Sequence, residues 1–154
     1  TSNPTFNDIY VADQIIHSGD TNTYTQFHAA DQWRVVVGGT ERLEVKNSSP
    51  HVLASGDFTA SGDVTAFSDE RLKSNVKTID SALEKVQNLR GVTFDKDGRE
   101  GLGVIAQEVQ AVIPQVVIEN EEYLSVAYGN MVGLLIEAIK EQQVQIEELK
   151  AKLE

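Results

Sequence analysis

The sequence VGLLIEAIKEQQVQIEELKAKL, residues 132–153, carries the clearest structural pattern in the chain. Its core positions recur at alternating intervals of three and four residues, which is the spacing of a heptad seam. The seam comprises Val132, Leu135, Ile139, Gln142, Ile146, Leu149 and Leu153. Because so narrow an apolar stripe favours association with copies of itself, the pattern predicts a coiled-coil helix over about residues 126–154. A polar Gln142 in the seam would lower the stability of the coiled coil and fix its register. The residue types at the seam favour two helices, but they do not determine the number of chains.

Residues 68–125 predict a small mixed α/β module. Ser81 and Glu84 have the spacing of a capping box, and Leu83, Val86 and Leu89 then share one helical face until Gly91. The short stretch GVTFD, which follows at 91–95, predicts a strand.

Two further stretches complete the predicted module. The sequence GLGVIAQEVQAVIP, residues 101–114, predicts a strand that leads into a short helix, which stops before Pro114. The sequence QVVIENEEYLSV, residues 115–126, predicts two short strands joined by an acidic turn.

Residues 1–67 predict strands and turns. In QWRVVVGGTERLEV, residues 32–45, two β-rich runs flank Gly38 and Gly39, which can adopt the positive φ angles of a tight hairpin turn. The stretch DIYVADQIIHSGD, residues 8–20, is a second apolar run that ends in a turn cluster.

A short repeat closes this first part of the chain. GDFTAS at 56–61 is followed by GDVTA at 62–66, with Phe58 and Val64 in the same place. A six-residue period predicts short strands that wind around an axis, although a plain hairpin with a chance repeat is the alternative. Because two copies cannot bury a face alone, we expect this part of the chain to need copies from other chains.

Composition excludes several classes of function. The net charge of −11 disfavours nucleic acid or anionic lipid as a partner, and no apolar run reaches the length of about 20 residues that a membrane span needs. The chain contains no cysteine, which excludes disulfides and thiolate metal sites. It begins at Thr1 rather than methionine, which predicts a piece of a longer protein.

Most candidate sites in the first part have an ordinary structural interpretation. His17, His28 and His51 lack metal-ligand spacing, so we predict no metal site and no cofactor. Asn47 begins a glycosylation triplet of a kind that is common by chance. Trp33 beside Arg34 could bind a sugar, but a core or interchain tryptophan is the simpler interpretation.

The stretch AFSDERLKSN, residues 66–75, offers one chemical hypothesis. On residue types alone, Ser68 or Asp69 before charged residues is typical of a helix cap. The alternative is a Ser68–Lys73 dyad, in which a neutral lysine takes the serine proton so that the oxygen can attack a carbonyl. A separation of five residues places the two about 140° apart on a helix and on opposite faces of a strand. They can therefore meet only across a bend or between neighbouring chains.

Three stretches together resemble a known family. SDERLKSNVKTIDSALEKVQNLRGVTF, GLGVIAQEVQAVIPQVV and YLSVAYGNMVGLLIEAIKEQ are similar to the endosialidase-type intramolecular chaperone domain, over about residues 68–142. That auto-processing domain ends many phage tail fibres and tailspikes and has a relative in a membrane-bound eukaryotic transcription factor. The opening S-D-x-R-x-K and the later G-x-I-A-Q-E-V, from Gly103 to Val109, are its most specific pieces.

The resemblance implies a trimer that helps a preceding β-rich stem to fold and then cuts itself before the motif serine. On this sequence the scissile bond is Phe67–Ser68, with Ser68 as nucleophile and Lys73 as general base. Asn75 stands where relatives often have an acidic residue.

The resulting prediction is an α+β chain: a homotrimeric β-rich fibre stem at 1–67, then a chaperone and auto-protease domain at 68–154. The protein would be made in the host cytoplasm and become part of the virion, and its chaperone part would be released. One alternative is a trimerisation clamp that does not cleave; another is a fibre tip whose stem binds a host receptor or glycan. A third is the transcription-factor relative, which the acidic, fibre-like first part disfavours.

Overall fold

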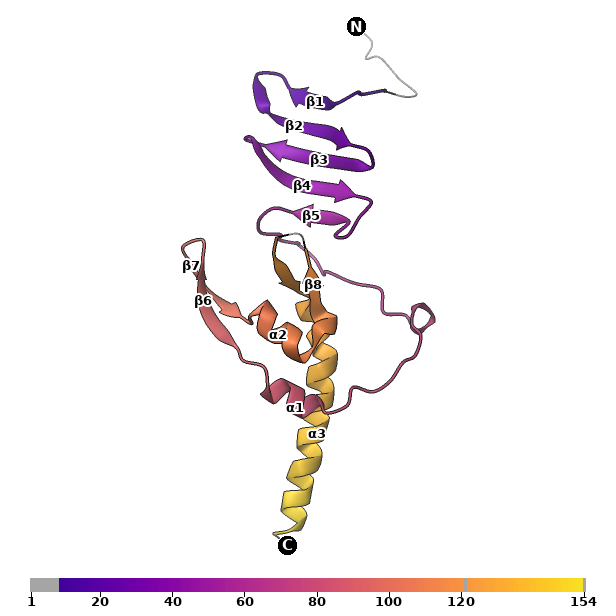
Figure 1. Ribbon diagram of the computed structural model, residues 1–154, viewed down its shortest axis with the longest axis vertical. Helices are drawn as coiled ribbons and strands as arrows, with labels where there is room; N and C mark the ends of the chain where they lie inside the picture. Colours follow the sequence, from indigo (N-terminus) through magenta and orange to yellow (C-terminus); the bar gives the residue numbers. More distant parts are fainter. Residues whose placement is uncertain (1–8, 121, 154) are drawn as a thin grey trace. The chain divides into compact units, whose positions relative to one another are not determined.

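The computed structural model describes residues 9–120 and 122–153 and divides into two compact units, Thr1–Phe67 and Ser68–Glu154 (Figure 1). The first unit contains a sheet, whereas the second combines helices with two small strand pairs. The mixture of sheets and helices, with a long helix near the C-terminus, agrees with the predicted α+β class.

The first unit is an antiparallel sheet in which each strand pairs with the next in sequence. The predicted hairpin is confirmed, because Gly38 and Gly39 adopt φ angles of +60° and +75° between its two strands. Glycine has no Cβ to clash in this left-handed region, which is why the turn can be so tight. The strands are β1 (Gln14–His17), β2 (Asp20–Ala29), β3 (Gln32–Val37), β4 (Thr40–Lys46) and β5 (Val52–Ala54).

This sheet has an apolar face and a polar face. Trp33 lies opposite Val45, which lies opposite Val52, and residues that pair directly across strands share a face. Val45 and Val52 are exposed on the apolar face, whereas the buried Val36 lies on the other face, on the same side as Arg34. The apolar face is therefore only partly covered within one chain.

The glycine-aspartate repeat forms no strand within the single chain. Residues 55–69 contain no helix or strand, and Phe58 and Val64 are exposed. Winding strands, which the sequence predicts only together with copies from other chains, stay a prediction, but the plain hairpin is wrong. The physical reason is that two short copies offer too little apolar area to offset the entropy of ordering them.

The second unit begins with a 3-10 helix and ends with the long helix (Figure 1). The predicted helix after Ser81 and the predicted strand-to-helix segment are present. The strand predicted at 91–95 is found at 92–96, and the closing strand pair is also found. Glu121 lies outside the described residues. The elements of this unit are η1 (Glu70–Leu72), α1 (Ala82–Gln87), β6 (Val92–Lys96), β7 (Arg99–Gly103), α2 (Ala106–Val112), η2 (Pro114–Val116), β8 (Val117–Glu119), β9 (Leu124–Val126), η3 (Tyr128–Asn130) and α3 (Met131–Ala151).

The core of this unit lies where α1, α2 and α3 meet. It joins residues that are far apart in sequence, and Leu83, Val86 and Leu89 pack against it from α1 and the turn after it, as predicted. The buried members are Ala82, Val109, Ile113, Val116, Leu134 and Ala138.

The predicted capping box at the start of α1 is wrong. Ser81 adopts a positive φ of +48°, and its side chain makes no capping hydrogen bond. Instead the Glu141 carboxylate, from α3, accepts hydrogen bonds from the backbone N–H groups of Ala82 and Leu83, each 2.8 Å long. A carboxylate suits this position because the first N–H groups of a helix lack partners and carry partial positive charge.

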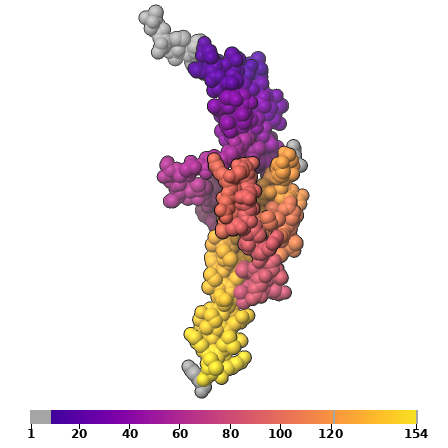
Figure 2. All heavy atoms as spheres, turned by 90° about the vertical axis from the view of Figure 1, so that its left-hand side faces the viewer, coloured from indigo at the N-terminus to yellow at the C-terminus, as the bar shows by residue number. Residues whose placement is uncertain are grey.

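The long helix begins later than predicted, at Met131 rather than near 126, because Leu124–Val126 pairs with β8. Leu134, Ala138 and Glu141 form one face, which packs on the unit, while the predicted seam lies on another face and is exposed. Residues 142–153 are all exposed, and in Figure 2 the end of the helix, in yellow, stands clear of the rest of its unit. In the part of the chain that the structure describes, no helix is both long and apolar enough to cross a membrane.

Candidate active site

Ser68 and Lys73, the two residues that the sequence singled out for chemistry, touch each other. Lys73 Nζ donates a hydrogen bond to Ser68 Oγ, with a distance of 2.7 Å between the two atoms. Both residues belong to the same chain and to the same compact unit. Of the two arrangements that their spacing allowed, the structure has the bend within one chain.

The bend is the short 3-10 helix η1. Leu72 donates its backbone N–H to the Asp69 carbonyl at 3.1 Å, and Lys73 donates its own to the Glu70 carbonyl at 2.9 Å. These bonds close two tight turns between extended residues, since Asp69 before the helix and Lys73 after it both have β-region backbone angles. The chain therefore reverses within a few residues, so that the lysine side chain returns to the serine.

Asp69 and Arg71 form a compact ion pair inside this bend. Asp69 Oδ1 accepts hydrogen bonds from the Arg71 backbone N–H at 2.9 Å and from Arg71 Nε at 3.0 Å, and Oδ2 accepts one from Nη2 at 2.7 Å. The guanidinium bonds, and then the backbone bond, lower the pKa of the Asp69 carboxyl below its ordinary value. The same pairing raises the pKa of Arg71. Both groups therefore stay charged across the physiological pH range, and each compensates the other's charge.

The site lies at the surface of the single chain. Phe67, immediately before the serine, is 97% exposed, and Leu72 is also exposed. A serine hydroxyl with a lysine amine at hydrogen-bond distance can perform nucleophilic attack on a carbonyl when the amine is neutral and accepts the serine proton.

The second motif, from Gly103 to Val109, has a structural explanation. A Cβ on Gly103 would lie 2.7 Å from Tyr128 Oη, so any other residue would require this ring to shift, and Val104 N–H approaches the same oxygen at 3.4 Å. At the other end of the motif, Val109 is 1% exposed in the core. Both ends of the motif therefore take part in the packing of the module.

Glu108 of the same motif ties α2 to the segment after α1. Arg90 donates hydrogen bonds to its carboxylate from Nε at 2.9 Å and 3.1 Å and from Nη2 at 2.7 Å. The Arg90 hydrogen bonds lower the pKa of Glu108 below its usual range.

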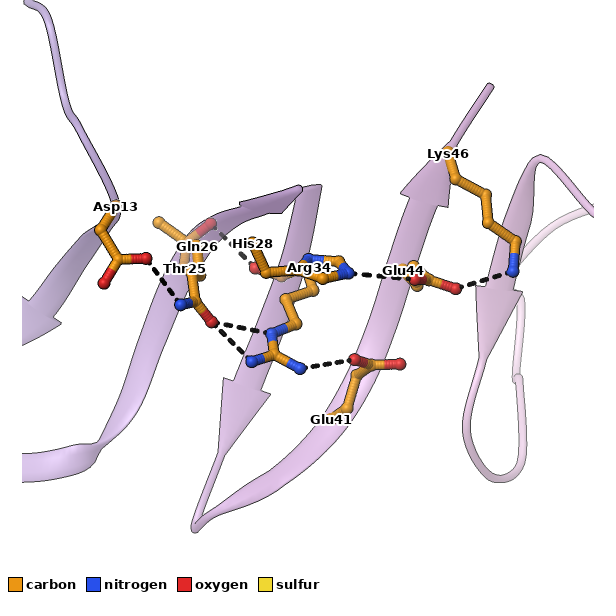
Figure 3. Close-up of polar contacts among 8 residues, drawn as sticks. All are labelled: Asp13, Thr25, Gln26, His28, Arg34, Glu41, Glu44 and Lys46. Carbon is orange, nitrogen blue, oxygen red and sulfur yellow. Dashed lines mark hydrogen bonds and ion pairs between the residues drawn. The ribbon is translucent and has the colours of Figure 1, made fainter. Parts of the chain in front are cut away.

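The sheet of the first unit does not bring Trp33 and Arg34 to one site. They are successive residues of β3, so their side chains lie on opposite faces. Arg34 donates to Gln26 Oε1 from Nε and Nη2, at 2.9 Å and 2.6 Å, and its Nη1 lies 3.3 Å from Glu41 Oε2 (Figure 3). The guanidinium is thus held within the sheet.

The three histidines are also separate from one another. His28 lies 3.4 Å from Glu44, which in turn pairs with Lys46 at 3.1 Å (Figure 3). His17 approaches Asp20, and His51 approaches the Lys46 carbonyl.

Comparison with known proteins finds a family that resembles the first part of the second unit. Residues 68–118 match the family described as chaperone of endosialidase, Peptidase_S74. Long tail fiber protein Gp37 of Enterobacteria phage K3 is 41% identical over 98 residues, which cover 56% of this chain and 8% of that protein. Long tail fiber protein Gp37 of Salmonella phage S16 is 29% identical over 140 residues, or 77% of this chain and 19% of that protein.

A relative of another kind matches as well. Myelin regulatory factor homolog 1 of Caenorhabditis elegans is 31% identical over 114 residues, which cover 65% of this chain and 12% of that protein. The chain thus spans between 8% and 19% of the length of these three relatives.

The family match begins at Ser68, the residue that opens the S-D-x-R-x-K motif and the second compact unit. The resemblance drawn from the sequence is therefore confirmed: residues 68–118 match the family described as chaperone of endosialidase, Peptidase_S74.

Proposed function

We propose that this chain is the C-terminal part of a phage tail fibre or tailspike, in which residues 68–154 drive trimerisation and folding of a β-rich stem and then release themselves. Release occurs by cleavage between Phe67 and Ser68. The observation that carries the proposal is the 2.7 Å contact between Lys73 Nζ and Ser68 Oγ, at the residue where the family match begins. The named tail fibre relatives support the fibre context.

The proposed reaction is one turnover of a serine endopeptidase whose substrate is its own backbone. Neutral Lys73 accepts the Ser68 hydroxyl proton, and Oγ attacks the carbonyl carbon of Phe67. The C–N bond of Phe67–Ser68 breaks, and the nitrogen leaves with the proton that Lys73 returns. Water then hydrolyses the resulting ester, which gives a carboxylate on Phe67 and a new amino terminus at Ser68.

Assembly of the trimer would favour the neutral form of Lys73 and so make cleavage depend on assembly. The lysine must lose its proton before it can act as a base, and removal of water from around an ammonium group favours the neutral form. In the single chain the site is at the surface, with Phe67 almost fully exposed. Burial against neighbouring chains would therefore activate the dyad after the trimer has formed, and so act as a check on assembly.

Two surfaces of the single chain support self-association. The seam of α3 exposes Leu135, Ile139, Ile146 and Leu149, which would be covered in a coiled coil. The apolar face of the first sheet is also only partly covered, and Val45 and Val52 are exposed on it. Association with copies of the chain would bury both surfaces, and the number three rests on the resemblance to the chaperone family.

The chaperone role follows from the cost of building an intertwined stem. Non-local contacts between three chains form only after a large loss of chain entropy. A helix that gathers the chains raises their effective concentration and lowers this cost. After cleavage the stem would be trapped kinetically, because refolding would lack the gathering device. The mature stem would remain in the virion, where a host receptor or glycan is its expected ligand.

Expression of wild-type chain beside Ser68→Ala and Lys73→Ala tests the proposal. We expect denaturing gels and N-terminal sequencing to show a wild-type fragment that begins at Ser68, with both variants uncut. A wild-type trimer that never yields this fragment would overturn self-cleavage and leave the non-cleaving clamp as the function. A stem that binds glycans or host cells would add the receptor-binding role.

A further inference from the structure

The hydrogen bonds that the Asp69 carboxylate accepts come from Arg71, within the bend, and not from the two proposed reacting groups, Ser68 and Lys73. One oxygen accepts from the Arg71 backbone N–H and from Nε, and the other accepts from Nη2. The first of these bonds caps η1, which the side chain of a residue before a helix can do. The other two hold the arginine side chain over the same turn.

This bend is what brings the proposed base to the nucleophile. Ser68 and Lys73 are five residues apart, a separation that neither a regular helix nor a strand can bring together. They meet because η1 reverses the chain, and Leu72 and Lys73 donate the backbone N–H groups that close it. All side chains of residues 67–80 are exposed, so packing against the core does not hold the turn in place.

The ion pair also reduces the effect of the Asp69 charge on the proposed base, Lys73. A free carboxylate near the lysine would favour its charged form and oppose its action as a base. Because Asp69 is paired with Arg71 through both of its oxygens, its charge is compensated locally. The acid can therefore shape the turn without holding the proton on the lysine.

We infer that Asp69, together with Arg71, is the positioning pair of the self-cleavage reaction: it holds η1 so that Lys73 reaches Ser68. This inference rests on the proposed function, because it assigns a role within that reaction. Neither residue exchanges a proton with the substrate.

The cleavage rate of assembled trimer tests the inference through a graded series. Asp69→Ala removes the cap and the ion pair, and we expect cleavage to slow by about 10- to 100-fold, since misplacement of a catalytic group by about 1 Å can cost about 100-fold. Asp69→Asn keeps an acceptor for the Arg71 N–H and should recover part of this loss. Glu70→Gln is the matched control, because Glu70 is an exposed acid in the same turn, and loss of its charge should not slow cleavage.

A double-mutant cycle asks whether the two residues act as one unit. If Asp69 works through Arg71, Asp69→Asn combined with Arg71→Gln should slow cleavage no more than the slower single variant. The unfolding midpoint and trimer size of every variant should match those of wild type, because η1 contains no buried residue. A uniform loss of stability would instead indicate a general structural role.

A second measurement does not depend on cleavage. In the Ser68→Ala background, nuclear magnetic resonance can follow the exchange of the Leu72 and Lys73 amide protons with water. Asp69→Ala should speed this exchange, whereas Glu70→Gln should not.

The outcomes separate this inference from the proposed function. Wild-type cleavage that Asp69→Ala leaves unchanged overturns the positioning role and leaves self-cleavage intact. A wild-type chain that is never cut overturns the proposed function, and the exchange rates then decide whether Asp69 holds the turn. Equal exchange with and without Asp69 overturns the inference in either case.

Discussion

The Glu141 carboxylate accepts a 2.8 Å hydrogen bond from the backbone N–H of Ala82, which lies 59 positions earlier in the chain. A second bond of the same length joins it to Leu83 N–H. Ser81 makes no capping hydrogen bond, so a side chain of the long helix caps α1 instead. The capped residue Ala82 is 0% exposed. This carboxylate connects the end of the chain to the start of the folded module.

Replacement of Glu141 by alanine should destabilise the second unit. The substitution leaves two helix-terminal N–H groups without a protein partner, which costs about 1 to 3 kcal/mol for a buried donor. Glu141→Gln, which keeps one acceptor oxygen, should cost about half as much. Urea unfolding measures both values, and Glu148→Ala, an exposed acid on the same helix, should change stability little. Equal midpoints for Glu141→Ala and Glu148→Ala would contradict the capping role.

Substitution of Gly103 by alanine should also destabilise the unit, by up to about 1 kcal/mol, less than overpacking of a closed core costs, because Tyr128 is 56% exposed and can move. Its Cβ would lie 2.7 Å from Tyr128 Oη, so the ring must shift and release Val104 N–H. Gly129→Ala is the control, because nothing lies within 4 Å of the added atom. Thermal unfolding should separate the two variants, and a Gly103 variant as stable as the Gly129 variant would refute the packing argument.

The pair between Arg90 and Glu108 predicts a pH dependence of stability. The Glu108 pKa is lowered from 4.5 by the Arg90 hydrogen bonds, so its ionised form favours the folded state. Its contribution is fully present above about 4.5, the carboxyl pKa in the unfolded chain, and disappears as the pH falls through the lowered value in the folded chain. Wild type should therefore exceed Glu108→Gln in stability near pH 7, and the difference should shrink as the pH falls below about 4.5 and disappear once the carboxyl is protonated in the folded chain. A difference that stays constant with pH would rule out an electrostatic origin.

Charges placed in the seam should prevent assembly. Ile139→Asp with Ile146→Asp would bury carboxylates in the proposed coiled coil, so we expect monomers by analytical ultracentrifugation and loss of cleavage. Val144→Asp is the control: Val144 is 54% exposed, against 65% and 40% for the two isoleucines, but it lies off the seam. A monomeric seam variant that still cut itself at the wild-type rate would show that cleavage does not depend on assembly.

Replacement of Lys73 by arginine tests the role of the amine. Arginine keeps the positive charge and can donate to Ser68, yet it cannot lose its proton in a protein. Cleavage should therefore fall by about 100- to 10,000-fold, the usual contribution of general base catalysis. A time course of fragment release measures it, and a rate close to wild type would mean that Lys73 only orients the serine.

Local signals in the sequence predicted much of this fold. Gly38 and Gly39 define a hairpin because only their backbone allows the turn, and the stop before Pro114 reflects a constraint on neighbouring residues. The heptad spacing located the long helix for the same reason, since a repeat along one element needs no knowledge of its surroundings.

Long-range contacts could not be predicted in the same way. Ser81 has the residue type of a cap, but the cap comes from Glu141, which no local pattern connects to it. The heptad pattern also did not predict that a second face of α3, with Leu134 and Ala138, is buried. These residues pack against a surface that forms only when the chain folds. For the candidate site, spacing required a bend between Ser68 and Lys73, but it did not reveal that Asp69 and Arg71 stabilise it.

The exposed end of α3 has a practical consequence for engineering. Residues 142–153 form no part of the core, whereas the faces that hold α1 and α2 end at Glu141. The helix can thus be spliced after Glu141 to a coiled coil of known copy number without disturbing the module. Such chimaeras, with two, three or four strands, would turn the number of chains into an experimental variable.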